Sequence, residues 1–187
     1  DCDTLIQKNL CQLFSTNLEG YSMMALREED IDSKIFRIRL GLEPKGDYFQ
    51  SGVLLMNLVY LRTQNLLKLE SVLETLKEKR DSIKVVDQDI INIHCNGTIK
   101  PLDARFNNCL VTNFNKSNWL RFLNYKSIPG ITDASILHYA TGKPWNNLYS
   151  GSCEHIWYKY LRLSPYGDLY AKKYATIWFN ILRSGLV

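Results

Sequence analysis

The order of apolar and polar residues predicts buried strands separated by surface helices. Residues 20–26 form a short apolar run that is typical of a buried strand. Residues 48–58 place a polar trio before a continuous apolar run, which predicts a loop that enters a strand buried on both faces. Residues 58–79 carry leucine and valine at helical spacing among charged residues, and this pattern predicts the longest helix of the chain, with its charges in solvent.

Shorter elements complete this pattern. Residues 9–14 predict a short helix that packs Leu10, Leu13 and Phe14 inward. The further predicted elements are a helix beginning at Asp87, a strand after Gly97, a short helix within residues 113–126, a strand at 135–139, and helices at 153–161 and from 165 toward 183. No internal repeat, low-complexity linker or coiled-coil pattern interrupts the order of these elements.

The length and composition fit one domain with its own core. The chain has 187 residues, of which 45% are hydrophobic, which is enough to bury a core and short for two full domains. A formal net charge of +4 permits a polyanionic or membrane-surface partner without requiring one. No nucleic-acid partner is expected, because the basic residues are dispersed and no recognition motif is present.

The cysteines and the hydropathy favour a reducing compartment. The five cysteines are scattered and form no Cys-x-x-Cys pair, so neither a disulfide framework nor a zinc ribbon is indicated. No apolar run approaches the roughly 20 residues that a spanning helix needs, and no charged-then-apolar leader opens the chain. We therefore expect a cytoplasmic protein, soluble or peripheral at the inner face of a membrane. Because Asp1 is not preceded by Met and runs directly into an apolar stretch, we also expect an N-terminal truncation.

Residues 137–146 combine several chemically useful side chains in one short stretch. Pro144 fixes its own φ and biases Lys143 away from helix, and Gly142 permits backbone geometries that other residues avoid, so a rigid turn is predicted. A neutral imidazole at His138 suits a divalent metal, and the ammonium of Lys143 suits a phosphate. Since a single histidine is more often a hydrogen-bonded structural residue than a ligand, His138 needs partners elsewhere in the chain.

Asp1 and Asp3 are candidates for those partners. In an extended segment the side chains of residues i and i+2 point to one face, where both carboxylates can bind a hard cation. The alternative is a solvated acidic turn, which is what a short Asp-x-Asp match represents in most proteins. The position of Asp1 and Asp3 beside an apolar stretch favours the metal site.

Two other polar groups adjoin predicted elements. Ser51 and Gly52 precede the apolar run of the 48–58 segment, where a glycine lets a ligand approach the backbone closely. Asp87 and Gln88 lie at a strand-to-helix junction, where an acidic residue favours the first turn of the helix. The same carboxylate and carboxamide are also well placed to bind sugar hydroxyls in a pocket at the C-terminal ends of strands.

Aromatic and basic residues are interleaved in the last part of the chain, between residues 153 and 183. The pattern fits an amphipathic segment that contacts a membrane surface peripherally, or a surface that binds an acceptor. It fits ordinary packing of helices onto the domain equally well.

Four motifs follow one another along the chain. They are Asp-x-Asp at residues 1–3, Gln-Ser-Gly-Val-Leu-Leu-Met-Asn at 50–57, Asp-Gln-Asp-Ile-Ile-Asn at 87–92 and His-Tyr-x-x-Gly-Lys-Pro-Trp at 138–145. In this order they resemble the family 8 glycosyltransferases, the group that contains glycogenin and the bacterial lipopolysaccharide glucosyl- and galactosyltransferases. The resemblance extends from Asp1 to about Pro165, and the bacterial enzymes are the more similar.

The resemblance implies an α/β fold of the GT-A type, which is a nucleotide-diphospho-sugar transferase fold with a mixed sheet flanked by helices. The first strands of that fold are expected to be missing from this chain. Residues 1–150 are then the C-terminal part of the catalytic domain, and residues 151–187 form a C-terminal helical segment. The resemblance also implies that Asp1, Asp3 and His138 hold Mn²⁺ or Mg²⁺.

Roles for the remaining candidates follow from the same resemblance. The residues implied in donor binding are Gln50, Ser51, Gly52, Gly142 and Lys143. Asp87 and Gln88 are implied as the catalytic pair, with Gln88 nearest in role to a group beneath the anomeric carbon. The family commonly has Asn at the position of Gln50 and one more residue between His138 and Lys143, so we expect shifted contacts to the sugar and the phosphate.

The implied activity is the metal-dependent transfer of glucose or galactose, with retention, from UDP-glucose or UDP-galactose to a saccharide or lipid-linked saccharide of the lipopolysaccharide type. Both a front-face attack and a double displacement are compatible with retention. The alternative function is a non-catalytic remnant that keeps the fold and lacks a competent nucleotide site.

Overall fold

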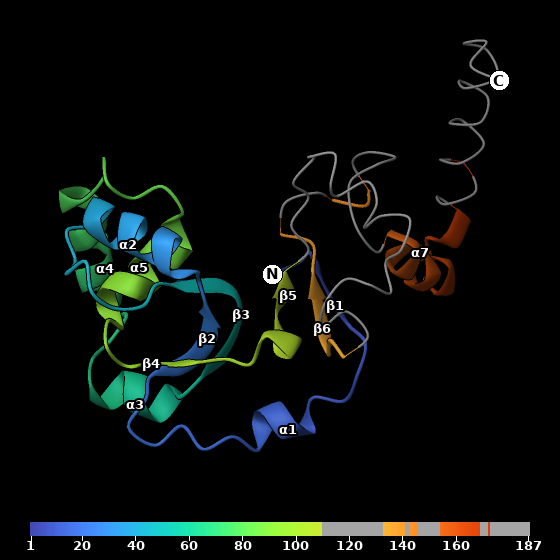
Figure 1. The fold of residues 1–187 in the computed structure, drawn as a ribbon, viewed down its shortest axis with the longest axis horizontal. Helices are drawn as coiled ribbons and strands as arrows, with labels where there is room; N and C mark the ends of the chain where they lie inside the picture. The colour runs from blue at the N-terminus through green and yellow to red at the C-terminus, as the bar shows by residue number, and fades with distance from the viewer. Residues whose placement is uncertain (110–132, 141–142, 146–153, 169–171, 173–187) are drawn as a thin grey trace, which may run out of the picture. The chain divides into compact units, whose positions relative to one another are not determined.

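The computed structural model describes residues 1–109, 133–140, 143–145, 154–168 and 172 (Figure 1). The chain divides into two compact units, which are described separately. The first unit comprises Asp1–Cys109 and Gly130–His138, and the second comprises Leu110–Pro129 and Tyr139–Val187. The helix predicted within residues 113–126 and most of the helix predicted from 165 toward 183 lie outside the described residues.

Strands and helices alternate through the first unit. In chain order its elements are β1 (Thr4–Ile6), α1 (Cys11–Phe14), β2 (Met23–Arg27), α2 (Asp30–Arg39), β3 (Phe49–Met56), α3 (Leu58–Thr63), α4 (Leu69–Glu78), α5 (Val86–His94), β4 (Ile99–Pro101), the 3₁₀ helix η1 (Ala104–Phe106), β5 (Asn108–Cys109) and β6 (Ile136–His138). Helix α7 (Glu154–Leu163) belongs to the second unit.

The described strands form two mixed sheets of three strands each. In one sheet, with the order β3-β2-β4, β2 pairs antiparallel with β3 and parallel with β4. In the other, with the order β1-β6-β5, β6 pairs antiparallel with β1 and parallel with β5. An α/β fold with mixed sheets is therefore what the structure shows. The paired strands of the second sheet are far apart in the sequence, because β1 at the start of the first unit pairs with β6 near its end.

Alternate residues of β2 point into two apolar clusters. Met23 and Ala25 lie in a cluster with buried residues of β3, α3, α5 and β4, whereas Met24 lies in a second cluster with Leu13, Leu102 and Phe106. Successive side chains of a strand point to opposite faces, so both faces of this central strand are covered. Figure 1 shows α2, α4 and α5 gathered together on one side of β2 and β3.

The predicted long helix at residues 58–79 is wrong. The structure has two helices there, α3 and α4, and the linker between them contains Asn65 at φ 55° and Leu67 at φ 59°. A left-handed residue cannot continue a right-handed helix. Leu66 and Leu67 instead pack against the cluster that contains Met23 and Ala25, so burial of these two leucines outweighs the helical pattern.

Two other details differ from the sequence predictions. Helix α1 is a single turn that buries Leu13, while Phe14 is 72% exposed, because one turn presents only one side to the core. Strand β3 is less buried than predicted. Leu54 packs against one apolar cluster and Val53 and Leu55 against the other, but most side chains of β3 are only half-buried. Gln50 and Ser51, expected in a loop, lie inside β3.

Candidate functional site

Two carboxylates and one imidazole meet at the end of the β1-β6-β5 sheet. Asp3 directly precedes β1, His138 is the last residue of β6, and the antiparallel register places Thr4 opposite His138. That pairing brings the first residues of the chain beside a histidine that is 135 positions away from Asp3 (138 − 3). The strand predicted at residues 135–139 is present as β6, and His138 is its last residue.

We call Asp1, Asp3 and His138 the acidic cluster. Their side-chain atoms are close enough to share one ion. His138 Nε2 lies 3.3 Å from Asp3 Oδ1 and 3.6 Å from Asp1 Oδ2. One ligand atom from each of the three residues lies within 4.8 Å of the others. His138 is 5% exposed and Asp3 is 9% exposed, whereas Asp1 is exposed. The cluster is therefore open to a ligand on the side of Asp1.

Gly52 of β3 and Asn107, which lies between η1 and β5, hold the imidazole ring. On the side away from the acidic cluster, His138 Nδ1 lies 2.9 Å from Asn107 Oδ1, and Asn107 is fully buried. Gly52 of β3 packs directly against the ring, because a Cβ at this position would lie 2.1 Å from His138 Cε1. The sequence analysis predicted that Gly52 lets a ligand approach the backbone closely. In the structure, the ring of His138 makes this close approach. The predicted contact of Gly52 with the donor sugar remains a prediction.

Replacing Gly52 by alanine is expected to displace His138 and weaken metal binding. The added methyl group would meet Cε1, Nδ1 and Nε2 of the ring at 2.1, 2.7 and 3.0 Å. Because contacts under 3 Å force a neighbour to move, the imidazole has to leave its position beside Asp3. Calorimetric titration with Mn²⁺ measures the loss. Gly20→Ala strains the backbone, because Gly20 has φ 77°, but its added methyl group meets no atom within 4 Å, so this variant controls for a general loss of stability. A Gly52→Ala variant with wild-type Mn²⁺ affinity would contradict this expectation.

The donor set fits a divalent cation. Carboxylate oxygens suit Mg²⁺ and Mn²⁺, and an imidazole nitrogen suits the first-row transition metals. A ligating histidine commonly donates its other ring N–H to a neighbouring oxygen, and Asn107 Oδ1 occupies that place here. Asp1, Asp3 and His138 are therefore the residues that would hold the ion.

Gln50 lies behind the acidic cluster, in a polar group that sequence reasoning missed. Its Oε1 accepts hydrogen bonds from Cys109 Sγ at 2.8 Å and from Asn107 Nδ2 at 3.4 Å. Near this group, burial raises the pKa of Glu28, and the carboxylates of Asp32 and Glu29 raise it further. Burial, together with the charge of Glu28, raises the pKa of the Cys109 thiol to about 12, so Cys109 remains a thiol near neutral pH.

Helix α5 carries Gln88 to the edge of β3. Gln88 Oε1 accepts a hydrogen bond from Ser51 N at 3.2 Å, so the predicted donor-binding and catalytic segments do meet. Asn92, one turn later, exchanges two hydrogen bonds with the backbone of Phe49, at 2.8 Å to the nitrogen and 2.7 Å to the oxygen. Asp87 is exposed in the first turn of α5. The predicted roles of Asp87 and Gln88 in catalysis stay predictions.

Asp89, the second aspartate of the same motif, is a fully buried anchor. It accepts hydrogen bonds from Tyr48 Oη, from both terminal nitrogens of Arg39 and from the backbone nitrogens of Lys84 and Val85. Burial opposes its ionisation, but the bonds from Arg39 and Tyr48 outweigh burial and hold the Asp89 pKa below its usual value. These contacts fix the start of α5, and with it the backbone that carries Gln88.

The residues that the sequence analysis missed carry weak signals. Asn92 lies four positions after Gln88, which is one helical turn and therefore the same face. Asn107 and Cys109 belong to a polar stretch that follows Phe106, and alternation along a strand places them on one side.

Lys143, which the sequence analysis predicted to contact a phosphate, lies in the second unit. Lys143 Nζ donates to the backbone oxygens of Tyr139 at 2.7 Å and Ala140 at 3.3 Å, so its ammonium stabilises the predicted turn. Pro144 is buried, and its oxygen accepts a hydrogen bond from Tyr158 Oη of α7 at 3.0 Å. Gly142 lies outside the described residues. The predicted contact of Lys143 with a diphosphate remains a prediction.

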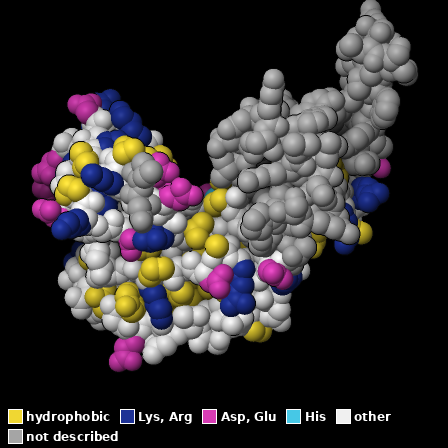
Figure 2. Space-filling model, in the orientation of Figure 1, with side chains coloured by type: hydrophobic (Ala, Val, Ile, Leu, Met, Phe, Trp, Pro, Cys, Tyr) yellow, Lys and Arg dark blue, Asp and Glu magenta, His cyan; other side chains and the backbone are white. Residues whose placement is uncertain are grey.

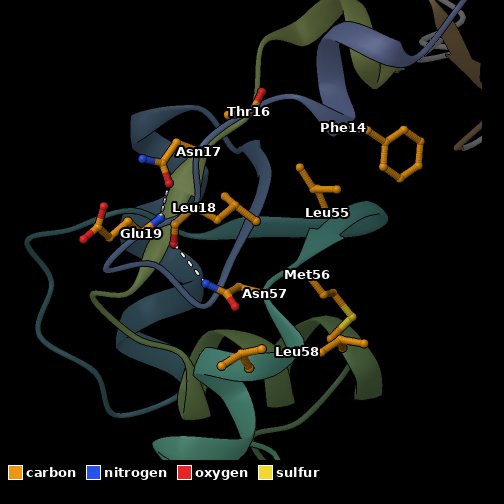
Figure 3. A pocket seen from close by; sticks show the side chains of 10 residues that line it. Phe14, Thr16, Asn17, Leu18, Glu19, Leu55, Met56, Asn57 and Leu58 are labelled. Atoms are coloured by element: carbon orange, nitrogen blue, oxygen red, sulfur yellow. Dashed lines mark hydrogen bonds between the residues drawn. The ribbon is translucent and has the colours of Figure 1, made fainter.

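A shallow groove of about 550 Å³ lies on the first unit between residues 14–19 and 55–59. Figure 3 shows Asn57 of this groove donating to the backbone of Leu18, with Phe14 and Met56 at its border. None of the acidic cluster lines it. Elsewhere on the face in Figure 2, basic and acidic side chains are interspersed over α2 and α4. In the part of the chain that the structure describes, no helix is long and apolar enough to cross a membrane.

The fold is the one found in solved glycosyltransferases of the GT-A type. The galactosyltransferase LgtC, solved with donor and acceptor sugar analogs, superposes with a TM-score of 0.63 at 22% identity, over 84% of this chain and 57% of that chain. GlyE of Streptococcus pneumoniae superposes with a TM-score of 0.62 at 20% identity, over 93% of this chain and 41% of that chain. At these identities the likeness concerns the fold.

The family model for glycosyl transferase family 8 matches residues 1–148. The chain belongs to this family, and the predicted resemblance and GT-A fold are confirmed. Among curated proteins, glycosyltransferase GlyA of Streptococcus pneumoniae is 27% identical over 161 residues, and lipopolysaccharide 1,2-glucosyltransferase of Escherichia coli is 28% identical over 149 residues. These alignments cover 86% and 78% of this chain but only 20% and 43% of the relatives, so the chain spans less than half the length of either protein.

Proposed function

We propose that the protein carrying this chain is a retaining, metal-dependent hexosyltransferase. It takes glucose or galactose from UDP-glucose or UDP-galactose and transfers the sugar to a saccharide or a lipid-linked saccharide of the lipopolysaccharide type. The observation that carries the proposal is the acidic cluster, in which Asp1, Asp3 and His138 converge from both ends of the first unit. Family membership supports the glycosyl transfer, and enzymes of the family typically depend on a metal.

The donor diphosphate is the group that the cluster would face. A bound Mn²⁺ or Mg²⁺ would neutralise the charge that develops on the departing nucleoside diphosphate. The side chains of Asp1, Asp3 and His138 would hold this ion, and we propose Lys143 and Gly142 as the residues that would contact the phosphates. Gln50, Ser51 and Gly52 form the strand edge along which the donor sugar binds.

The transfer breaks the bond between the anomeric carbon and the β-phosphate oxygen and forms a bond to an acceptor hydroxyl oxygen. In a front-face attack the acceptor proton passes to the leaving phosphate oxygen, so no protein base is needed. A double displacement needs a nucleophile beneath the anomeric carbon, and Gln88 with Asp87 is nearest in role. Asp89 is not available for that role, because both of its oxygens are occupied and it is fully buried.

The acceptor and the place of action are proposed from weaker support. The relatives include a lipopolysaccharide glucosyltransferase, which favours a saccharide on a lipid at the cytoplasmic face of a membrane. Helix α7 presents Lys159, Tyr160 and Arg162 among aromatic residues, which fits peripheral membrane contact. The second candidate function is a non-catalytic remnant that keeps the fold. It is favoured by the ammonium of Lys143, which is bonded to the backbone oxygens of Tyr139 and Ala140.

Titration with UDP in the presence and absence of Mn²⁺ separates these two functions. An enzyme of the proposed kind is expected to bind UDP in the micromolar range with Mn²⁺ and far more weakly without it, because the metal neutralises the diphosphate. Isothermal titration calorimetry measures both affinities, and Asp81→Asn, which removes an exposed carboxylate away from the cluster, is the control variant. Absence of UDP binding at millimolar concentration with Mn²⁺ would favour the remnant.

A further inference from the structure

We infer that Asn107 is a positioning residue that keeps a proton on His138 Nδ1 and thereby turns the lone pair of Nε2 toward Asp1 and Asp3. The inference rests on the proposed metal site, whose third ligand is His138. Asn107 Oδ1 lies 2.9 Å from Nδ1, on the side of the ring opposite to the acidic cluster. Because a neutral imidazole carries its proton on one nitrogen only, an acceptor at Nδ1 leaves Nε2 able to bind a cation.

The amide of Asn107 has a defined orientation because of Gln50. Asn107 Nδ2 donates to Gln50 Oε1 at 3.4 Å, and Cys109 Sγ donates to the same oxygen at 2.8 Å. Rotating the Asn107 amide by half a turn would bring its oxygen against Gln50 Oε1 and present an N–H to His138. Two facing oxygens without a proton between them repel each other, and Asn107 is buried beyond the reach of solvent that could compensate.

Cys109 supports the same orientation of Gln50. The thiol proton needs an acceptor, and Cys109 Sγ lies 2.8 Å from Gln50 Oε1, so the oxygen of the Gln50 amide faces Cys109 and Asn107. Each donor in the series then points the same way, from His138 Nδ1 to Asn107 Oδ1 and from Asn107 Nδ2 to Gln50 Oε1. This one direction of donation places the Nδ1 proton at the start of the series.

Other candidates for the Nδ1 partner are poorer. Cys109 Sγ lies 3.6 Å from His138 Nδ1, and its proton is directed to Gln50. The competing arrangement is a proton on Nε2 that is donated to Asp3, across 3.3 Å. The 2.9 Å contact with Asn107 is the shorter one, and it connects two buried groups. Asn107 is therefore the group on which the protonation pattern of the ring depends.

The test reads the protonation of the ring and the affinity for metal separately. Long-range ¹H–¹⁵N NMR of the metal-free protein shows which ring nitrogen of His138 carries a proton, and with three histidines in the sequence the His138→Ala variant assigns the signal. Calorimetric titration with Mn²⁺ gives the affinity. The variants are Asn107→Leu, which removes the acceptor, Asn107→Asp, which keeps an oxygen there, and Cys109→Ala, which removes the other neighbour of Nδ1.

We expect a proton on Nδ1 in the wild type, in Asn107→Asp and in Cys109→Ala. In Asn107→Leu the proton is expected to move to Nε2, and the Kd for Mn²⁺ is expected to rise about 10- to 100-fold, as for the loss of other residues that orient metal ligands. An unprotonated Nδ1 in the wild type, or unchanged protonation and Mn²⁺ affinity in Asn107→Leu, would overturn the inference. If Asn107→Leu does not fold, Asn107→Ala, which removes the same acceptor, takes its place.

The proposed function can fail independently of this inference. A wild-type protein with a proton on Nδ1 but without measurable Mn²⁺ binding would support the positioning role of Asn107 and contradict the metal site. Mn²⁺ binding by a wild-type protein whose Nδ1 is unprotonated in the metal-free state would support the metal site and contradict the positioning role of Asn107.

Discussion

Replacement of His138 by alanine is expected to lower Mn²⁺-dependent turnover of a UDP-hexose by more than about 100-fold. The variant removes the buried member of the acidic cluster, and the two aspartates that remain offer a weaker site for a cation that has to stabilise a leaving diphosphate. The measurement is the release of UDP with and without acceptor, at saturating Mn²⁺. Unchanged turnover in His138→Ala would exclude this residue as a ligand.

The matched control for this variant is His94→Ala. His94 ends α5, and its Nε2 hydrogen-bonds Thr75 Oγ1 at 3.0 Å on the helical side of the unit. It is half-buried like many surface histidines, so its loss tests whether removal of any imidazole from the first unit reduces activity. Turnover by His94→Ala is expected to remain within about twofold of the wild type, because surface substitutions away from special features change stability little.

The sequence predicted that Asp1, Asp3 and His138 come together, but it did not predict the residues that surround them. Asp1, Asp3 and His138 could be named because carboxylate and imidazole chemistry is visible in residue type, and the order of motifs connects the two ends of the chain. The pairing of β1 with β6, which brings them together, spans more than 130 residues and leaves no local pattern. The contact between Asn107 and His138 depends on the pairing of β5 with β6, which has no local pattern either, so it could be found only in the structure.

Some helices and strands could likewise be predicted from the sequence, and others could not. Strands β2 and β6 follow from short apolar runs, and α5 follows from its acidic first turn. Helix α2 was missed because basic and apolar residues alternate through it, a pattern with the period of a strand. Its buried Arg37 explains how such a sequence can be helical, since the guanidinium donates to the backbone oxygens of Glu43 and Asp47. Tertiary hydrogen bonds, which local periodicity does not express, determine that segment.

The largest expected effect on stability is that of Asp89→Asn, at about 3–5 kcal/mol, the usual cost of removing one partner from a buried ion pair. Asparagine would place N–H groups against the donors of Arg39, of Tyr48 or of the backbone at Lys84 and Val85. Urea denaturation followed by amide hydrogen exchange in α5 measures the loss, with Asp81→Asn as the exposed control.

The pH dependence gives this substitution a second, independent readout. The folded-state pKa of Asp89 lies below its usual value, so its charge contributes stability that is fully present above the unfolded pKa of about 3.9 and is lost as the pH falls through the folded-state pKa. The difference in unfolding free energy between wild type and Asp89→Asn should therefore be constant near neutrality and shrink below about pH 4. A difference that stays the same down to pH 3, or is below about 1 kcal/mol at pH 7, would show that the paired charge is not what holds the start of α5 against β3. Since Gln88 is carried by that same turn, loss of the Asp89 anchor should also reduce turnover in the folded variant at neutral pH, through the position of Gln88 and with Mn²⁺ affinity unchanged.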